Sequence, residues 1–191
     1  MSTPPASRLR ASAPSRTTPW VVGLGGNLGD SRRIFQQALH QLAKVASVRG
    51  VSRLYRSRPQ GGPVQADYFN AAALVVTSLS PEALLDSLLG IERLHGRQRR
   101  EPLGPRTLDL DLLWSTPRLE LRTSRLTVPH PRLRLRLFAL LPLLDLCPEA
   151  RAPEDGATYG AIMEALPDQG VVVLEDFGWC GTPGSGTSPS E

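Results

Sequence analysis

Lysine, cysteine and aromatic residues are scarce in this chain of 191 residues. Lys44 is the one lysine among 22 basic residues, aromatic residues make up 5% of the sequence, and Cys147 and Cys180 are the two cysteines. Two cysteines cannot build a disulfide framework, and their spacing fits no zinc motif. No apolar run approaches the roughly 20 residues that a bilayer-spanning helix needs, so we expect no integral membrane protein.

The two ends of the chain differ in composition from its middle. Residues 1–18 are rich in Ser, Pro, Thr and Arg without any acid, and residues 181–191 are rich in Gly, Ser, Thr and Pro. Such segments bury too little apolar area to offset chain entropy. We expect a disordered extension at 1–18, one domain of ordinary size at 19–178 and a flexible tail at 179–191. A secretory apolar core is absent, which favours the cytoplasm, with an organelle transit peptide as the alternative.

Positive charge is concentrated in the middle of the chain. Eleven arginines and four acids lie between Arg93 and Arg136, whereas nine acids and one arginine follow from Asp145 onward. Because the planar guanidinium fork suits phosphate oxygens, we expect a polyanionic partner. Charge alone does not choose between a nucleotide and a nucleic acid.

Periodicity predicts alternating strands and helices. Strands are expected at 20–24, 48–55, 68–77 and 107–114, one helix after Asp30 with Val45 on its apolar face, and a second capped by Ser80. The order strand, helix, strand, strand, helix, strand is that of the ferredoxin-like split βαβ arrangement. The fold class is therefore α+β: a ferredoxin-like sandwich with an antiparallel sheet and a C-terminal extension, which holds a helix near 133–141 and a strand at 171–174.

Two carboxylates alternate with leucines on the fourth predicted strand. Asp109 and Asp111 project from one face, while the leucines at 108, 110 and 112 face the core. Magnesium commonly binds one or two carboxylates together with substrate phosphates. An acidic strand face without a function is the alternative, but the surrounding cations favour a metal–nucleotide site. Those cations are Arg97, Arg99, Arg100, Arg106, Arg125, Arg132, Arg134 and Arg136, and His130 lies among them in the sequence.

Two further segments carry weaker signals. Residues 23–30 form a glycine-rich turn from strand to helix that lacks the Lys-Ser/Thr ending of a P-loop and the spacing of a dinucleotide fingerprint. The segment 68–70, Tyr-Phe-Asn, either presents a ring and an amide to a planar ligand or packs in the core. Both readings of 68–70 stay open at this point.

Taken together, five segments resemble the 6-hydroxymethyl-7,8-dihydropterin pyrophosphokinase family of the folate pathway. They are Gly-Gly-Asn-Leu-Gly-Asp (25–30), Tyr-Arg-Ser (55–57), Asp-Tyr-Phe-Asn-Ala (67–71), Gly-Pro-Arg-Thr-Leu-Asp-Leu-Asp (104–111) and Leu-Thr-Val-Pro-His-Pro-Arg (126–132). The resemblance covers residues 20 to about 150. It implies a ferredoxin-like fold and transfer of the β,γ-pyrophosphoryl group of ATP to the pterin's hydroxymethyl oxygen, with release of AMP.

The resemblance also implies roles for individual residues. It makes Asp109 and Asp111 ligands of two Mg2+ ions. Catalytic residues would be Arg97, Arg99, Arg106, Asp109 and Asp111. ATP would be bound by Glu92, Arg97, Arg99, Arg106, Leu112, Arg125, Thr127, His130 and Arg136, and the pterin by Ser57, Tyr68, Asn70 and Phe138. The expected partners are the pterin and ATP, with no nucleic acid or membrane, and the expected state is a monomer.

One departure from the family and two rival functions complete the picture. A family member carries a tryptophan where this chain has Leu103, and the loop before Leu103 is short. In the family this loop would close over ATP, so the departure affects how the loop packs on the nucleotide. An RNA-binding module would use the same strand order but needs exposed aromatic residues on its strands. A regulatory or scaffold relative without catalysis is the other rival, and ATP turnover separates it from an enzyme.

Overall fold

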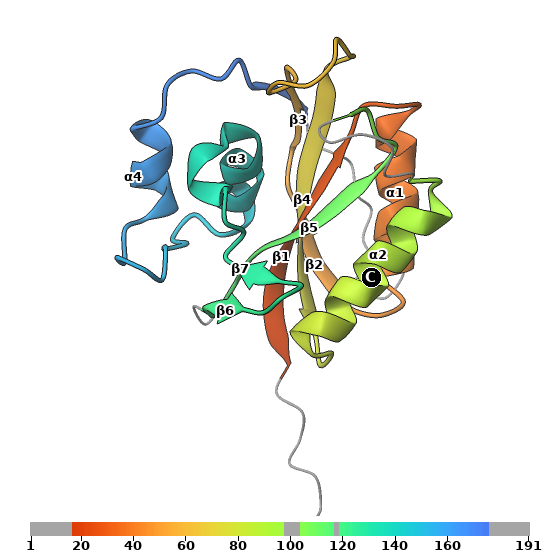
Figure 1. The fold of residues 1–191 in the computed structure, drawn as a ribbon. Coiled ribbons are helices and arrows are strands. Elements are labelled where there is room, and N and C mark those ends of the chain that lie inside the picture. Colours follow the sequence, from red (N-terminus) through yellow and green to blue (C-terminus); the bar gives the residue numbers. More distant parts are fainter. Residues whose placement is uncertain (1–16, 98–103, 117–118, 176–191) are drawn as a thin grey trace, which may run out of the picture.

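A six-stranded antiparallel sheet lies between two layers of helices in the computed structural model, which describes residues 17–97, 104–116 and 119–175 (Figure 1). The path runs β5–β1–β4–β3–β8, and β2 also pairs with β4. This is the strand order of the predicted split βαβ arrangement, so the expected α+β class is confirmed. The strands are β1 (Thr18–Gly26), β2 (Ser47–Val51), β3 (Leu54–Ser57), β4 (Tyr68–Thr77), β5 (Asp109–Ser115) and β8 (Val172–Glu175).

The first helical layer consists of α1 (Ser31–Leu42) and α2 (Pro81–Leu94), which cover one face of the sheet (Figure 1). Asp30 caps α1 by accepting a hydrogen bond from the Arg33 N–H at 3.1 Å. Helix α1 ends at Leu42, so the prediction that Val45 lies on its apolar face is wrong. Val45 lies in the turn after the helix, 39% exposed.

The second predicted strand, 48–55, is in fact two strands that pair with different parts of β4. The side chain of Ser52 explains the break between β2 and β3. Its Oγ accepts a hydrogen bond from the Ala72 N–H at 2.8 Å, in a position that a backbone carbonyl would otherwise take in the ladder. The same hydroxyl donates to the Arg53 carbonyl at 2.8 Å. A local side-chain hydrogen bond thus competes with regular pairing, which alternation of apolar residues does not reveal.

The second layer lies on the opposite face of the sheet and is built from the C-terminal part of the chain (Figure 1). It contains α3 (Leu137–Leu146) and α4 (Tyr159–Glu164), preceded by a 3-10 turn, η1 (Leu133–Leu135), and a small hairpin of β6 (Leu121–Arg122) and β7 (Thr127–Val128). The single helix expected at 133–141 is therefore two elements, because Arg136 between them is extended (φ −127°, ψ 101°). The sequence did not predict α4 or the hairpin. No described helix is long and apolar enough to cross a membrane.

Candidate active site

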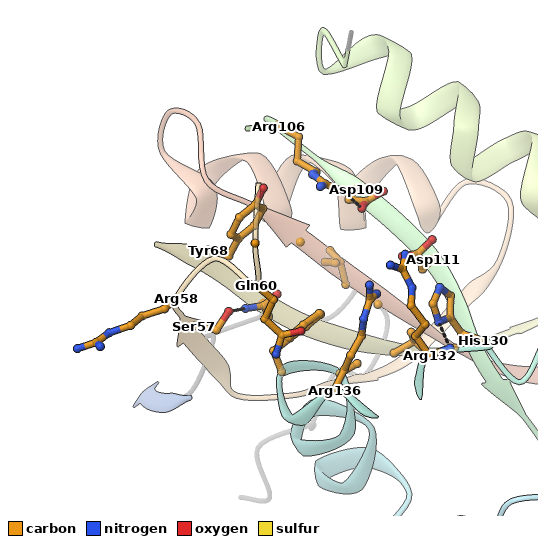
Figure 2. Close-up of a pocket in the computed structure, with 18 of the residues that line it drawn as sticks. Ser57, Arg58, Gln60, Tyr68, Arg106, Asp109, Asp111, His130, Arg132 and Arg136 are labelled. Atoms are coloured by element: carbon orange, nitrogen blue, oxygen red, sulfur yellow. Dashed lines mark hydrogen bonds and ion pairs between the residues drawn. The ribbon is translucent and has the colours of Figure 1, made fainter. Parts of the chain in front are cut away.

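A cavity of about 750 Å3 opens between the sheet and α3. Strands β1, β4 and β5 form its floor, the start of α3 forms one wall, and the loop after β3 forms another (Figure 2). Ten of the residues predicted for the site line it, and they come from six different segments of the chain. They are Ser57, Tyr68, Asn70, Arg97, Arg106, Asp109, Asp111, His130, Arg136 and Phe138.

The two aspartates lie on β5 opposite two glycines of β1. In the antiparallel register Asp109 faces Gly25 and Asp111 faces Gly23, and all four residues line the cavity. The glycines place no side chain over the carboxylates, so the space above the aspartates is open to a ligand. Leu110 and Leu112, between and beyond them, lie in the core beneath α1 and α2, which confirms the predicted alternation.

The two carboxylates differ in their surroundings. Asp109 is held between two guanidinium groups, with 2.6 Å from Arg97 Nη1 to Oδ1 and 2.6 Å from Arg106 Nη1 to Oδ2. No described side chain forms an ion pair or hydrogen bond with the carboxylate of Asp111. Burial and the charge of Asp109 raise the pKa of Asp111 to about 6, against the opposing effect of Arg97 and Arg136. In the protein alone, the nearby arginines therefore do not fully offset the cost of a negative charge at Asp111.

Glu92 connects α2 to the cavity from behind. Its side chain is 2% exposed, and Oε1 accepts hydrogen bonds from the Leu110 N–H at 2.8 Å and from the Arg97 guanidinium. Burial raises the pKa of Glu92 to about 7, although Leu110 and Arg97 act in the opposite direction. Glu92 does not line the cavity; it fixes Arg97 against β5.

The glycine-rich turn after β1 holds the segment that carries Arg106. The N–H groups of Asn27 and Leu28 donate to the Arg106 carbonyl at 2.9 and 3.2 Å, and the Arg106 N–H donates to Asn27 Oδ1 at 2.9 Å. Gly26 permits this close approach, since a Cβ there would lie 2.5 Å from the Thr107 carbonyl oxygen. The turn is therefore a support for Arg106. Asn27 was not singled out from the sequence, although it lies within the Gly-Gly-Asn motif.

The opposite part of the cavity combines an amide, a hydroxyl and two rings. Asn70 Nδ2 donates to Ser57 Oγ at 2.9 Å, and Tyr68 donates from its hydroxyl to the Gly104 carbonyl at 3.0 Å. The Arg136 guanidinium lies 5.3 Å from the centroid of the Phe138 ring. Of the segment 68–70, Tyr68 and Asn70 line the cavity, whereas Phe69 packs against the core.

His130 and Arg132 line the same side of the cavity as Asp111 (Figure 2). His130 Nδ1 accepts a hydrogen bond from the Arg132 N–H at 3.2 Å. Burial, together with the positive charges of Arg136 and Arg132, lowers the pKa of His130 to about 4, so the imidazole is neutral at physiological pH. Arg132 belongs to the predicted arginine cluster but had no individual role.

Several predicted residues lie outside the cavity lining. The Leu112 side chain is buried in the core, so only its backbone could face a ligand. Thr127 lies on β7, and Arg125 extends from the hairpin to pair with Asp86 of α2. Arg99 and Leu103 lie outside the described residues, as do most of the predicted terminal segments. Arg58, in the loop after β3, is by contrast a lining residue, although its guanidinium extends outward from the other labelled side chains (Figure 2).

The donor set fits a hard divalent cation that is completed by a ligand. Among the described residues, no three His, Cys, Asp or Glu side chains gather into a protein-only metal site. The cavity instead offers two carboxylates on adjacent positions of one strand face, and Asp111 forms no ion pair with any residue that the structure describes. Magnesium is usually held by one or two carboxylates with substrate phosphates and water. Asp109 and Asp111 therefore suit a cation that arrives with a phosphorylated ligand.

Comparison with known proteins gives a consistent result. The family described as 7,8-dihydro-6-hydroxymethylpterin-pyrophosphokinase matches residues 21–148. A 2-amino-4-hydroxy-6-hydroxymethyldihydropteridine pyrophosphokinase of Synechocystis is 46% identical over 148 residues, which cover 76% of this chain and 75% of the relative. The enzyme of the same name from Pseudomonas aeruginosa is 41% identical over 152 residues, which cover 78% of this chain and 93% of the relative.

Solved structures agree on the fold. The HPPK-DHPS protein of Plasmodium falciparum, with STZ-DHP, superimposes with a TM-score of 0.64 at 16% identity. The match covers 80% of this chain and 46% of that longer one, so the present chain corresponds to less than half of it. At this identity the likeness shows the ferredoxin-like α+β fold and no more. The sequence match over residues 21–148 and the identity to the bacterial enzymes show that this chain belongs to the 7,8-dihydro-6-hydroxymethylpterin-pyrophosphokinase family.

Proposed function

We propose that this protein transfers the pyrophosphoryl group of ATP to the hydroxymethyl oxygen of 6-hydroxymethyl-7,8-dihydropterin, producing AMP and the pterin diphosphate for folate biosynthesis. The observation that carries the proposal is one cavity with two chemically different ends. One end is rich in guanidinium groups around two carboxylates, and the other presents an amide, a hydroxyl and an aromatic ring. The first suits a metal-bound triphosphate and the second a flat, polar heterocycle.

At the phosphate end, Arg97, Arg106 and Arg136 are the groups that would bind the transferred phosphates. In the protein alone Asp109 forms ion pairs with both Arg97 and Arg106, at 2.6 Å from each. Phosphate oxygens would compete for these guanidiniums and hold them where negative charge develops during transfer. His130, neutral at physiological pH, can donate one hydrogen bond to the nucleotide without adding charge. Arg99, Arg125 and Thr127 remain proposed nucleotide contacts on the resemblance to the family.

Two Mg2+ ions are proposed to be held by Asp109 and Asp111 when ATP is bound. Divalent cations held there would neutralise charge on the phosphate chain and orient it. The residues of the chain do the rest: Glu92 keeps Arg97 in place, and the turn at 25–30 keeps Arg106 in place. None of the described groups at the pterin end of the cavity is an evident general base for the hydroxymethyl oxygen, and none is proposed. Positioning and charge stabilisation are then the main contributions of the protein.

At the pterin end, Asn70 would read the hydrogen-bonding edge of the ring and Phe138 would stack on its face. Asn70 is held by Ser57 and is 5% exposed, so its amide has a fixed direction. Buried polar groups of fixed direction discriminate strongly, because a ligand that cannot pair with them leaves them unsatisfied. Tyr68 would line the same end, tied to Gly104.

The proposed partners are the two small-molecule substrates, bound by a monomer in the cytoplasm. Support against an RNA-binding role comes from Trp20 and Trp114, which are 1% and 6% exposed and so are not available for base stacking on their strands. The two carboxylates on the sheet would also repel a nucleic-acid backbone. Light scattering coupled to gel filtration would test the oligomeric state.

Product analysis tests the proposed function. Purified protein is incubated with Mg-ATP, with and without the pterin, and AMP and ADP are separated by ion-exchange chromatography. AMP that depends on the pterin, without ADP, is the expected result. ADP as the pterin-dependent product, or no turnover by a folded protein that binds Mg-ATP, would contradict the proposal.

A further inference from the structure

Gln169, in the loop before β8, forms hydrogen bonds on both sides of Arg136. Its Oε1 accepts from the Leu137 N–H at 3.0 Å, and its Nε2 donates to the Leu135 carbonyl at 2.9 Å. The side-chain amide thus pairs with the backbone much as a neighbouring strand would. These contacts bridge more than 30 residues of sequence, and they fix the backbone that carries the Arg136 side chain.

This contact also supplies a cap that α3 otherwise lacks. Arg136 is the N-cap residue of α3, and its side chain makes no capping hydrogen bond. The first N–H groups of a helix have no partner within the helix, and a side chain from elsewhere can satisfy them. Gln169 does so for Leu137, the first residue of α3. The start of α3 is therefore defined by a residue far along the chain.

Arg136 lines the cavity, and the position of its guanidinium there depends on the backbone that carries it. Among the described residues Arg136 forms no ion pair, and its guanidinium lies 5.3 Å from the centroid of the Phe138 ring. Figure 2 shows its guanidinium extending across the cavity toward Asp111. Burial lowers the pKa of Arg136, with Arg132 acting in the same direction. An arginine without a carboxylate partner is free to bind a ligand anion, so its backbone must supply the precision.

Gln169 has a third contact, which reaches the loop after β3. Gln60 Nε2 donates to Gln169 Oε1 at 2.7 Å, and Gln60 lines the cavity. One amide oxygen therefore joins the wall formed by the loop to the wall formed by α3. Movement of the loop or of α3 would therefore disturb a hydrogen bond that Gln169 makes to the other wall.

The loop that carries Gln169 is itself well anchored. The Gly170 N–H donates to Asp168 Oδ1 at 2.8 Å, and Gly170 adopts a φ of +63°, which favours glycine. Two residues later β8 begins and pairs with β3 at the edge of the sheet. Gln169 is therefore anchored, through β8, to the same sheet that carries Asp109 and Asp111.

We infer that Gln169 is a positioning residue for the proposed reaction: it sets the start of α3, and with it Arg136 and Phe138, and it joins this wall to the Gln60 loop. The inference rests on the proposed function for its kinetic consequence, but the contact itself can be tested without turnover. Sequence reasoning had no signal for it, because Gln169 lies in a short polar loop at a separation of 32 residues from Leu137.

Three variants separate the parts of this arrangement. Gln169→Met keeps the length of the side chain and removes all three hydrogen bonds. Gln169→Glu keeps the acceptor for Leu137 and Gln60 but loses the donor to Leu135. Gln60→Met removes the loop contact alone. Gln37→Ala, on an exposed position of α1 in the other helical layer, is the matched control.

The first measurement is amide hydrogen exchange of ligand-free protein by NMR. In Gln169→Met the Leu137 amide is expected to exchange at least about tenfold faster, whereas Gln169→Glu and Gln60→Met retain protection. The second is steady-state AMP formation. Gln169→Met is expected to lower kcat about tenfold and raise the KM for the pterin about fivefold, with Tm within about 2 °C of wild type. Gln37→Ala is expected to match wild type in every assay.

The outcomes are distinct. Unchanged Leu137 exchange in Gln169→Met would overturn the contact, and wild-type kcat and KM with faster exchange would overturn the positioning role. A large fall in Tm with both KM values unchanged would show a merely structural residue and also overturn it. If wild-type protein makes no pterin-dependent AMP, the proposed function fails, and the exchange rate alone then decides whether Gln169 holds α3.

Discussion

Asp109 and Asp111 are two residues apart on one strand, yet their electrostatic surroundings differ. Asp109 is clamped by Arg97 and Arg106, while Asp111 has no such partner among the described residues. The charge of Asp111 is compensated only from a distance, and its pKa is raised to about 6. A cation bound with ATP would supply the missing charge, so Asp111 is the residue whose replacement should separate stability from function.

Asp111→Asn is expected to reduce turnover by at least about 100-fold, since it removes one of two proposed metal ligands. Without ligands its Tm should equal or exceed that of wild type, because the amide needs no counter-charge in a buried position. Thermal denaturation and the AMP assay are performed on the same preparation. Normal turnover, or a clear loss of ligand-free stability, would contradict the assignment.

Asn70 and Ser57 allow the pterin site to be tested separately from the phosphate site. Asn70→Ala is expected to raise the KM for the pterin by about tenfold or more while the KM for ATP changes less than twofold. Ser57→Ala should have a smaller effect in the same direction, since it removes only the hydrogen bond that orients the Asn70 amide. Equal changes in both KM values for Asn70→Ala would argue against a pterin-reading role.

At the level of residues, the sequence predicted side chains that share a motif or a strand face. Asp109 and Asp111 alternate with core leucines, and Tyr68 and Asn70 stand two apart on β4. Supporting residues were missed where their contacts depend on tertiary structure. Asn27 and Gln169 act through hydrogen bonds to backbone 79 and 32 residues away, and no local pattern encodes such a pairing.

Helix α3 is joined to the sheet at its far end as well. Asp145 accepts hydrogen bonds from the Tyr55 hydroxyl at 2.8 Å, from the Arg53 N–H at 3.0 Å, and from the Arg53 guanidinium at 2.6 Å. Gln169 holds the start of α3 and Asp145 holds its last turn. This wall of the cavity is therefore fixed at both ends by residues of the sheet or of the loop before β8.

The ion pair of Asp145 makes stability depend on pH. Burial acts to raise the pKa of Asp145, but hydrogen bonds from Arg53 and Tyr55 outweigh it and lower the pKa below the ordinary value of 3.8. A carboxyl group whose pKa is lower in the folded state stabilises the folded protein, and this stabilisation is complete at pH values above the pKa of the group in the unfolded chain. That stabilisation is lost as the pH falls through the folded pKa.

Asp145→Asn is accordingly expected to lower the free energy of unfolding by about 1–3 kcal/mol at pH 7, with a smaller difference from wild type below about pH 4. Urea denaturation at several pH values measures this. Asp155→Asn is the control, because Asp155 pairs with Arg134 at the surface and should contribute little. A difference between wild type and Asp145→Asn that stays constant or grows toward acid pH would contradict the pKa direction.

Elements were predictable where an apolar face extends over several turns or a full strand. Helix α2 begins at Pro81 after Ser80, as the sequence signals indicate, and β8 agrees with the predicted strand to within one residue at each end. The break at Ser52, the extended residue Arg136 and the six-residue α4 were not predictable. Each depends on one hydrogen bond or one dihedral angle, or is too short for a period to show.

At the scale of the whole molecule, the described residues form two apolar clusters, one on each face of the sheet. The first is formed with α1 and α2, and the second joins the sheet to the C-terminal layer through residues such as Val21, Leu140 and Tyr159. The second cluster carries α3, and therefore one wall of the active site. The C-terminal extension expected from the sequence thus forms a packed layer. Its residues lie far from β1 in the sequence but pack against it in the fold.

Leu140→Ala tests whether this layer is integral to the fold. Leu140 is fully buried, so the substitution is expected to cost about 2–5 kcal/mol of unfolding free energy through lost burial and an unfilled cavity. Leu135→Ala, at a site that is 63% exposed, is the matched control and should cost under about 1 kcal/mol. Urea denaturation of both variants provides the values. A loss below about 1 kcal/mol for Leu140→Ala would indicate that the layer is loosely attached.

The central claim is that both the β- and the γ-phosphate leave ATP together. The most direct measurement uses ATP labelled at the β-phosphate, incubated with the protein, Mg2+ and the pterin, followed by separation of the pterin product from the nucleotides. The account predicts that the label moves to the pterin while unlabelled AMP accumulates in equal amount. Label that stays on ADP would show transfer of a single phosphoryl group, and label in free pyrophosphate without the pterin would show hydrolysis; either result would contradict the proposed reaction.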